Sequence, residues 1–193
     1  MNTSFPNLSR RGFLMGALAT AATIITEPLM AQPGASDWRK RLLDQDRVLN
    51  LYRPQTKERR IFCYWKKGQG FQKTGYLDGI WLLRDATYKK QSFIDANLFD
   101  VLFIIQQWLT IEGRNPEIQV LSGYRTPEHN FRLEGAAKQS LHMQGKACDI
   151  HVPGVTTKLL AAMSMMIAAG GVGIYQDRGF IHVDTGKIRT WRG

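Results

Sequence analysis

The chain has 193 residues, of which 44% are hydrophobic, and a formal net charge of +10. This length and composition predict one globular domain with a substantial core plus a short appendage, and they exclude wholesale disorder. The positive charge favours polyanionic partners, but the basic residues are spread along the chain and form no cluster interleaved with aromatic residues, so no nucleic-acid-binding module is predicted.

The first 31 residues have the organisation of an export signal. The pair Arg10-Arg11 precedes an apolar stretch over residues 13–25 that begins with Phe-Leu, and Ala31 offers a small residue for cleavage. The arginine pair with these flanks resembles a twin-arginine signal. The apolar run is short and rich in alanine and threonine, which does not favour a stable membrane span. We therefore expect residues 1–31 to be a twin-arginine signal and the protein to be exported to the periplasm, with no stable span after signal removal.

The remaining chain predicts a linker with a short helix over residues 32–47, followed by one domain over 48–193. The short surface helix is expected within residues 36–48. Two runs rich in strand-forming residues, 60–65 and 76–83, flank a turn that contains glycine, and they predict a hairpin. In segment 95–111, apolar residues recur at three- and four-residue spacing, which predicts a helix.

The C-terminal half alternates buried strands with helical or polar segments. The predicted elements are strands over 118–121, 147–152, 172–175 and 180–184, a helix over 156–169, and a long polar loop or broken helix over 122–141. This order indicates an α+β domain with an antiparallel sheet and flanking helices.

The two cysteines, Cys63 and Cys148, are not in a CxxC motif, which excludes a cysteine zinc site. Two isolated cysteines are more often small buried side chains than a disulfide. A disulfide between them is the alternative in an oxidising compartment.

Two motifs place metal-binding residue types on neighbouring segments. Residues 140–149 read Ser-Leu-His-Met-Gln-Gly-Lys-Ala-Cys-Asp, and residues 179–184 read Gly-Phe-Ile-His-Val-Asp. Strand alternation turns Asp149 away from the apolar face that carries Cys148 and Ile150. In the later strand it likewise turns His182 away from the face that carries Ile181 and Val183. With His142 these residues supply two imidazoles and one carboxylate. This set suits a catalytic zinc ion with the fourth position left for water.

The pattern Ser-x-His-x-x-Gly-x-Ala-x-Asp followed by a hydrophobic strand with histidine resembles the LAS-type zinc peptidases, which include D-Ala-D-Ala carboxypeptidases and the peptidase-like domain of hedgehog proteins. The twin-arginine signal, Ser-Gly-Tyr-Arg-Thr-Pro at 122–127 and the Phe-Ile-His-Val-Asp ending are most similar to the YcbK-like murein endopeptidases. The resemblance covers about residues 48–193 and implies a hedgehog or D-Ala-D-Ala peptidase-like fold. It implies Zn2+ as the cofactor, with His142, Asp149 and His182 as the metal ligands, and Arg125 as the substrate-positioning residue.

The general base departs from the family pattern. Many members of the family carry a carboxylate three residues before the last histidine, and this position is Gly179 here. Asp184 shares a strand face with His182, close enough to reach a water at the metal or to orient a ligand, and it is the preferred catalytic carboxylate. Asp177, in the preceding turn, and His151 are the alternatives.

The predicted function is zinc-dependent hydrolysis of amide bonds in peptidoglycan crosslinks, with stem peptides as the substrate. One alternative is a D-Ala-D-Ala carboxypeptidase. The other is a non-catalytic zinc-containing module that binds cell-wall peptide, which the missing acid at position 179 would allow.

Overall fold

The computed structural model describes residues 35–193, and the signal expected over residues 1–31 lies outside them. The strands are β1 Arg47–Arg53, β2 Glu58–Lys66, β3 Gly70–Phe71, β4 Ile118–Ser122, β5 Ala147–His151, β6 Gly171–Tyr175, β7 Phe180–Asp184 and β8 Arg189–Arg192. The helices are α2 Ala35–Leu43, α3 Lys73–Leu83, α4 Ala96–Ile111, α5 Pro127–Arg132 and α6 Thr157–Ile167, with 3-10 turns η2 Leu141–Gln144 and η3 Gln176–Arg178.

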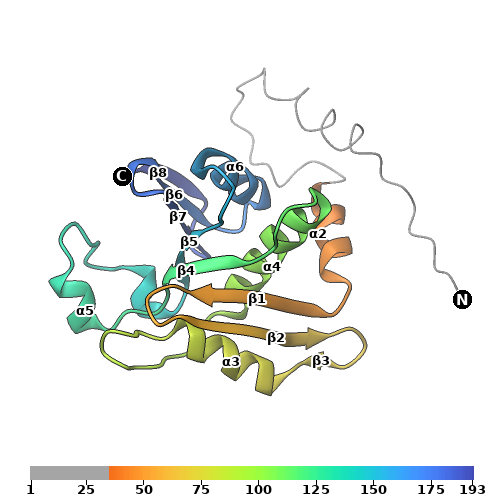
Figure 1. Ribbon diagram of the computed structural model, residues 1–193, viewed down its shortest axis with the longest axis horizontal. Helices are drawn as coiled ribbons and strands as arrows, with labels where there is room; N and C mark the ends of the chain where they lie inside the picture. Colours follow the sequence, from red (N-terminus) through yellow and green to blue (C-terminus); the bar gives the residue numbers. More distant parts are fainter. Residues whose placement is uncertain (1–34) are drawn as a thin grey trace, which may run out of the picture.

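The strands form one sheet in the order β3-β2-β1-β4-β5-β7-β6-β8, with helices packed beside it (Figure 1). Most neighbouring strands are antiparallel, and the pairs β1–β4 and β6–β8 are parallel. The predicted α+β class with an antiparallel sheet and flanking helices is therefore confirmed, with two parallel pairs added. The antiparallel run β4-β5-β7-β6 brings together the two motifs that carry the expected metal ligands.

Helix α4 forms the centre of the core and confirms the helix predicted over 95–111. Asp95 caps its N-terminus by accepting a hydrogen bond from the Asn97 amide. The helix is apolar on most of its circumference and packs against both β1 and α6. Its fully buried side chains include Leu98, Phe99 and Leu102. A helix that is apolar over most of its surface is stable only when other elements cover it, which explains its position between neighbouring elements.

The hairpin predicted over 60–83 is wrong in its second half, because the run over 76–83 belongs to helix α3. Its buried residues Tyr76, Ile80 and Leu83 recur at three- and four-residue spacing. Two glycines allow α3 to lie close to the core. A Cβ atom on Gly75 would stand 1.8 Å from the Cys63 carbonyl oxygen, and one on Gly79 would stand 2.5 Å from the Phe99 ring.

Strands β1 and β8 were not predicted. The helix expected over 36–48 ends at Leu43, and the chain enters β1 at Arg47. In β1, Leu49 and Leu51 are fully buried. Strand β8 is short and mostly exposed, so it lacks the apolar alternation that identifies a strand.

The two cysteines are free, so no disulfide joins Cys63 to Cys148. Within residues 35–193, none of the helices combines the length and the apolar character that a bilayer crossing requires.

Candidate metal centre and substrate cleft

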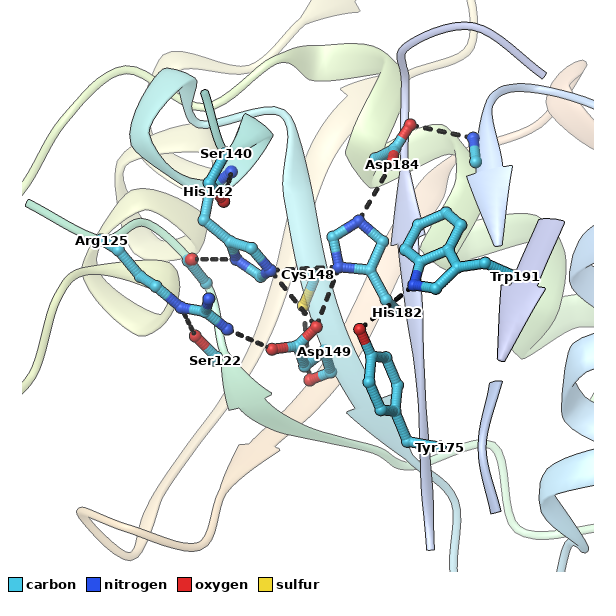
Figure 2. Close-up of polar contacts among 12 residues, drawn as sticks. Ser122, Arg125, Ser140, His142, Cys148, Asp149, Tyr175, His182, Asp184 and Trp191 are labelled. Carbon is cyan, nitrogen blue, oxygen red and sulfur yellow. Dashed lines mark hydrogen bonds and ion pairs between the residues drawn. The ribbon is translucent and has the colours of Figure 1, made fainter. Parts of the chain in front are cut away.

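The three expected ligands come from adjacent elements. Asp149 on β5 is the register partner of His182 on β7, so their side chains leave the same face of the sheet. His142 lies in η2, just before β5. The turn between them ends at Gly145, which has φ +66° and whose Cβ position would lie 1.9 Å from the Phe93 carbonyl oxygen. The three side chains converge on one point (Figure 2).

The distances between the converging atoms fit a metal ion. The Nε2 atom of His142 lies 3.2 Å from Asp149 Oδ1 and 3.1 Å from His182 Nδ1, and the last two atoms are 3.0 Å apart. A tetrahedral zinc ion with bonds of about 2.0–2.1 Å separates its ligand atoms by roughly 3.3 Å. The three groups therefore need little movement to hold such an ion.

The outer hydrogen bonds of the two histidines direct their lone pairs inward. Nδ1 of His142 lies 2.7 Å from the Gly123 carbonyl oxygen, which can only accept, so this nitrogen carries the proton. Nε2 of His182 likewise donates to Asp184 Oδ2 at 3.0 Å. When both rings are neutral, as metal ligands must be, His142 Nε2 and His182 Nδ1 present lone pairs to Asp149. Three electron-rich atoms at this spacing repel one another unless a cation lies between them.

Burial and the shared carboxylate perturb all three groups. Burial lowers the pKa of His142, although Asp149 opposes this effect. Burial also acts to lower the pKa of His182, but hydrogen bonds to Asp149 and Asp184 outweigh it and raise the value. Burial alone would raise the pKa of Asp149, yet His142, His182 and Arg125 together hold it well below its usual range. Asp149 is therefore an anionic ligand at neutral pH.

Asp184 lies behind His182, on the side away from Asp149. Its side chain is fully buried. One oxygen accepts from His182 Nε2, and the carboxylate also pairs with Arg189 and accepts from the amides of Gly171 and Gly186. These hydrogen bonds outweigh burial and hold the pKa of Asp184 below its usual range. Of the two roles expected for Asp184, the geometry supports orienting a ligand and not reaching a water at the metal.

Arg125 lies at the opposite side of the metal centre, as Figure 2 shows. Its Nη2 atom forms an ion pair with Asp149 Oδ2, the oxygen that does not face the histidines, and its Nε atom donates to Ser122 Oγ at 2.8 Å. The side chain is 15% exposed. The expected cleft position of Arg125 agrees with this geometry, and its remaining N–H groups are donors for a ligand in the cleft.

A buried carboxylate fixes the segment that carries Arg125. Asp85 Oδ2 accepts from the amide and the hydroxyl of Thr126 at 2.9 and 3.1 Å, and it lies 3.0 Å from His129 Nδ1. Backbone hydrogen bonds from Thr126 and Tyr88 help to overcome burial and lower the pKa of Asp85. The residue after Arg125 is thus anchored to the core by a charged acceptor. Asp85 was not predicted from the sequence.

The metal centre forms part of a cleft of about 660 Å³. One wall is aromatic and comprises Tyr175, Phe180 and Trp191. The Trp191 ring centroid lies 5.2 Å from that of His182, and its Nε1 donates to the Tyr175 hydroxyl at 3.2 Å. Trp191 comes from the unpredicted strand β8. In the sequence, the feature that could have indicated this close contact is the glycine at position 173. A Cβ atom there would fall 2.6 Å from the Trp191 ring.

The other candidate bases differ in position. Asp177 is exposed in η3, and His151 places its Nδ1 atom 2.8 Å from the Gly179 carbonyl oxygen; neither side chain lines the cleft. Among the described residues, two acidic side chains line the cleft, those of Asp149 and Glu134. Glu134 is exposed and forms no ion pair within residues 35–193, and it was not predicted from the sequence.

A pair of imidazoles with one buried carboxylate, set in a cleft with an arginine beside it, defines the mononuclear centre of a metallopeptidase. Comparison with known families identifies which one. The family described as peptidoglycan L,D-endopeptidase MepK matches residues 42–191, and the chain belongs to this branch of the M15 metallopeptidases. The resemblance to LAS-type zinc peptidases is thereby confirmed.

Two curated relatives are similar over nearly their whole length. A probable peptidoglycan L,D-endopeptidase MepK of Haemophilus influenzae is 31% identical over 188 residues, which cover 95% of each chain. The peptidoglycan L,D-endopeptidase MepK of Escherichia coli K12 is 31% identical over 186 residues, 94% of this chain and 96% of the relative. No solved structure gives a significant match.

Proposed function

We propose that this protein is a zinc-dependent endopeptidase that hydrolyses amide bonds in the peptide crosslinks of peptidoglycan. The observation that carries the proposal is the convergence of His142 Nε2, Asp149 Oδ1 and His182 Nδ1 within 3.0–3.2 Å of one another at the cleft. Membership of the MepK family supports crosslinks as the substrate, and the names of the relatives point to a bond between an L and a D centre.

His142, Asp149 and His182 would hold the zinc ion, which supplies Lewis acidity and makes water a nucleophile near neutral pH. The chain's own groups perform the remaining tasks. Asp184 keeps the proton of His182 on Nε2 and so leaves Nδ1 free for the metal. Arg125 binds a carbonyl or carboxylate oxygen of the substrate through the N–H groups that Asp149 and Ser122 do not occupy.

Glu134 is the carboxylate that we propose as the acceptor of a proton from water, because it lines the cleft and is not one of the metal ligands. Because it forms no ion pair within the described residues, both of its oxygens are available to accept a proton. Asp184, by contrast, uses both oxygens in hydrogen bonds inside the protein.

The test is digestion of purified peptidoglycan with and without a chelator, with the fragments identified by mass spectrometry. An endopeptidase converts crosslinked dimers into monomers only when metal is present. Release of terminal D-alanine alone would show a carboxypeptidase. Binding to peptidoglycan without any new fragment would show the non-catalytic module. His142→Ala serves as the control that lacks a ligand but retains the cleft arginines.

A substrate in the cell wall requires a location outside the cytoplasm. We propose that residues 1–31 provide the route, as a twin-arginine signal that sends the domain to the periplasm. The arginine pair and the weak apolar stretch that follows it support this proposal.

A further inference from the structure

Three arginines line the cleft, and they differ in how their charge is compensated. Arg125 is paired with Asp149, and Arg189 is paired with Asp184. Arg178 has no carboxylate partner among residues 35–193, and the exposed Glu134 forms no ion pair with it. Among the three arginines of the cleft, Arg178 is thus the one whose charge no carboxylate of residues 35–193 compensates.

An aromatic platform holds Arg178 in place. Tyr175 and Phe180 are register partners at the end of the β6–β7 hairpin, and their rings stack with centroids 4.6 Å apart and an angle of 15°. The guanidinium carbon of Arg178 lies 4.4 Å from the Tyr175 centroid and 5.2 Å from the Phe180 centroid. The turn that folds Arg178 back over the rings ends at Gly179, which has φ +72°.

The contact with the two rings determines how the guanidinium of Arg178 can bind a ligand. A guanidinium that lies over an aromatic ring uses its flat face there and keeps its N–H donors at the edge, where they match the two oxygens of a carboxylate. The platform also reduces the conformational entropy that a free arginine loses when it binds. The cluster of Arg178, Tyr175 and Phe180 therefore has the features of a preorganised carboxylate subsite.

The position of the platform relative to the metal centre indicates which carboxylate it meets. Phe180 and His182 lie on the same face of β7, two residues apart, which is roughly 6.5–7 Å along a strand. An extended peptide covers about this distance with two residues, and a long side chain covers it from the residue beside the cleaved bond. Because Arg178 contacts the Phe180 ring and lines the same cleft as His182, a side-chain carboxylate of a residue next to that bond is the substrate group that faces Arg178 when the bond lies at the metal centre.

We propose that Arg178, held by Tyr175 and Phe180, selects crosslinks in which a residue flanking the cleaved bond carries a free side-chain carboxylate. This inference rests on the proposed endopeptidase function and adds the charge state of the substrate that the cleft accepts. Conversion of that carboxylate to a carboxamide removes the charge and one of the two acceptor oxygens, and binding weakens accordingly.

The experiment uses two synthetic crosslinked stem peptides that differ only at this group, one a free acid and the other a carboxamide. For the parent protein we expect kcat/KM to favour the acid by on the order of 10- to 100-fold, the size of one lost charge-assisted contact. In Arg178→Gln the preference falls to roughly 1, because the acid loses its partner. Arg192→Gln, the same charge change on the neighbouring strand at a residue that does not line the cleft, keeps the preference within about twofold.

Affinity of the two peptides for chelator-treated protein, measured by calorimetry, provides a second readout that needs no turnover. Equal affinity of the parent for acid and carboxamide, or an unchanged preference in Arg178→Gln, overturns the subsite. A parent that prefers the acid in calorimetry but cleaves neither peptide supports the subsite and contradicts the endopeptidase function, so the two failures are distinguishable.

Discussion

Replacement of Asp184 by asparagine separates the two roles considered for this residue. One oxygen of Asp184 accepts from the amides of Gly171 and Gly186, both at 2.8 Å. The other oxygen accepts from His182 Nε2 at 3.0 Å and from Arg189 Nη2 at 2.7 Å. An asparagine places its NH2 group at one of these positions, so in either orientation at least two donors lose their acceptor and face another donor.

The magnitude follows from this count of donors. Each unsatisfied buried donor costs about 1–3 kcal/mol, and one of the two donors on Oδ2, Arg189, is 43% exposed and can turn to solvent. Asp184→Asn should therefore lower the free energy of unfolding by roughly 1–6 kcal/mol, depending on the orientation of the amide. In either orientation His182 Nε2 loses its charged acceptor, because it faces either the NH2 group or a neutral amide oxygen. The loss of such a partner typically lowers metal affinity by about 10- to 100-fold, and the neutral oxygen gives the smaller effect. Urea unfolding measures the first effect, and zinc competition against a chromophoric chelator measures the second.

The opposite pattern would refute this reasoning. If Asp184→Asn binds zinc and unfolds like the parent but turns over on the order of 10²- to 10⁴-fold more slowly, Asp184 is the proton acceptor. Asp177→Asn is the control, since Asp177 is an exposed aspartate outside the cleft. It should change neither metal affinity nor stability.

The other predictions concern the cleft, its support and export. Arg125→Lys should keep bound zinc but lower kcat/KM by at least about tenfold, because lysine lacks the planar fork; parental kinetics would make Arg125 dispensable. Glu134→Gln should lower kcat by about 10²-fold or more with KM little changed. An unaltered kcat would mean that another residue, Asp184, Asp177 or His151, is the general base. The pKa of Asp85 is depressed, so its stabilisation is present above its unfolded value of about 3.9 and is lost as the pH falls through the folded value. In urea unfolding, Asp85→Asn should therefore be about 2 kcal/mol less stable than the parent at neutral pH, and the gap should shrink as the pH falls below the unfolded value; a gap independent of pH would contradict the charged role. Replacement of Arg10 and Arg11 by lysine should leave the protein in the cytoplasm on cell fractionation, and unchanged export would exclude the twin-arginine route.

The sequence determined the features that depend on local periodicity. Apolar residues at helical spacing specified α4, and alternation in β5 and β7 put Asp149 and His182 on faces opposite the buried Ile150 and Ile181. With His142 in a recognisable motif, local pattern alone therefore indicated the three ligand types. The run over 76–83 was predicted as a strand because its apolar residues are nearly continuous, and a continuous apolar run does not distinguish a strand from a buried helix.

Only the tertiary structure decided the features that depend on register and contact. The role of Asp184 follows from which nitrogen of His182 it contacts, and a spacing of two along a strand does not specify this. Trp191 and Arg178 reach the cleft because β8 pairs with β6 and the β6–β7 turn folds back over its own rings. Pairing between distant segments depends on the complementary shapes of residues far apart in the chain, and neither local pattern nor spacing contains that information.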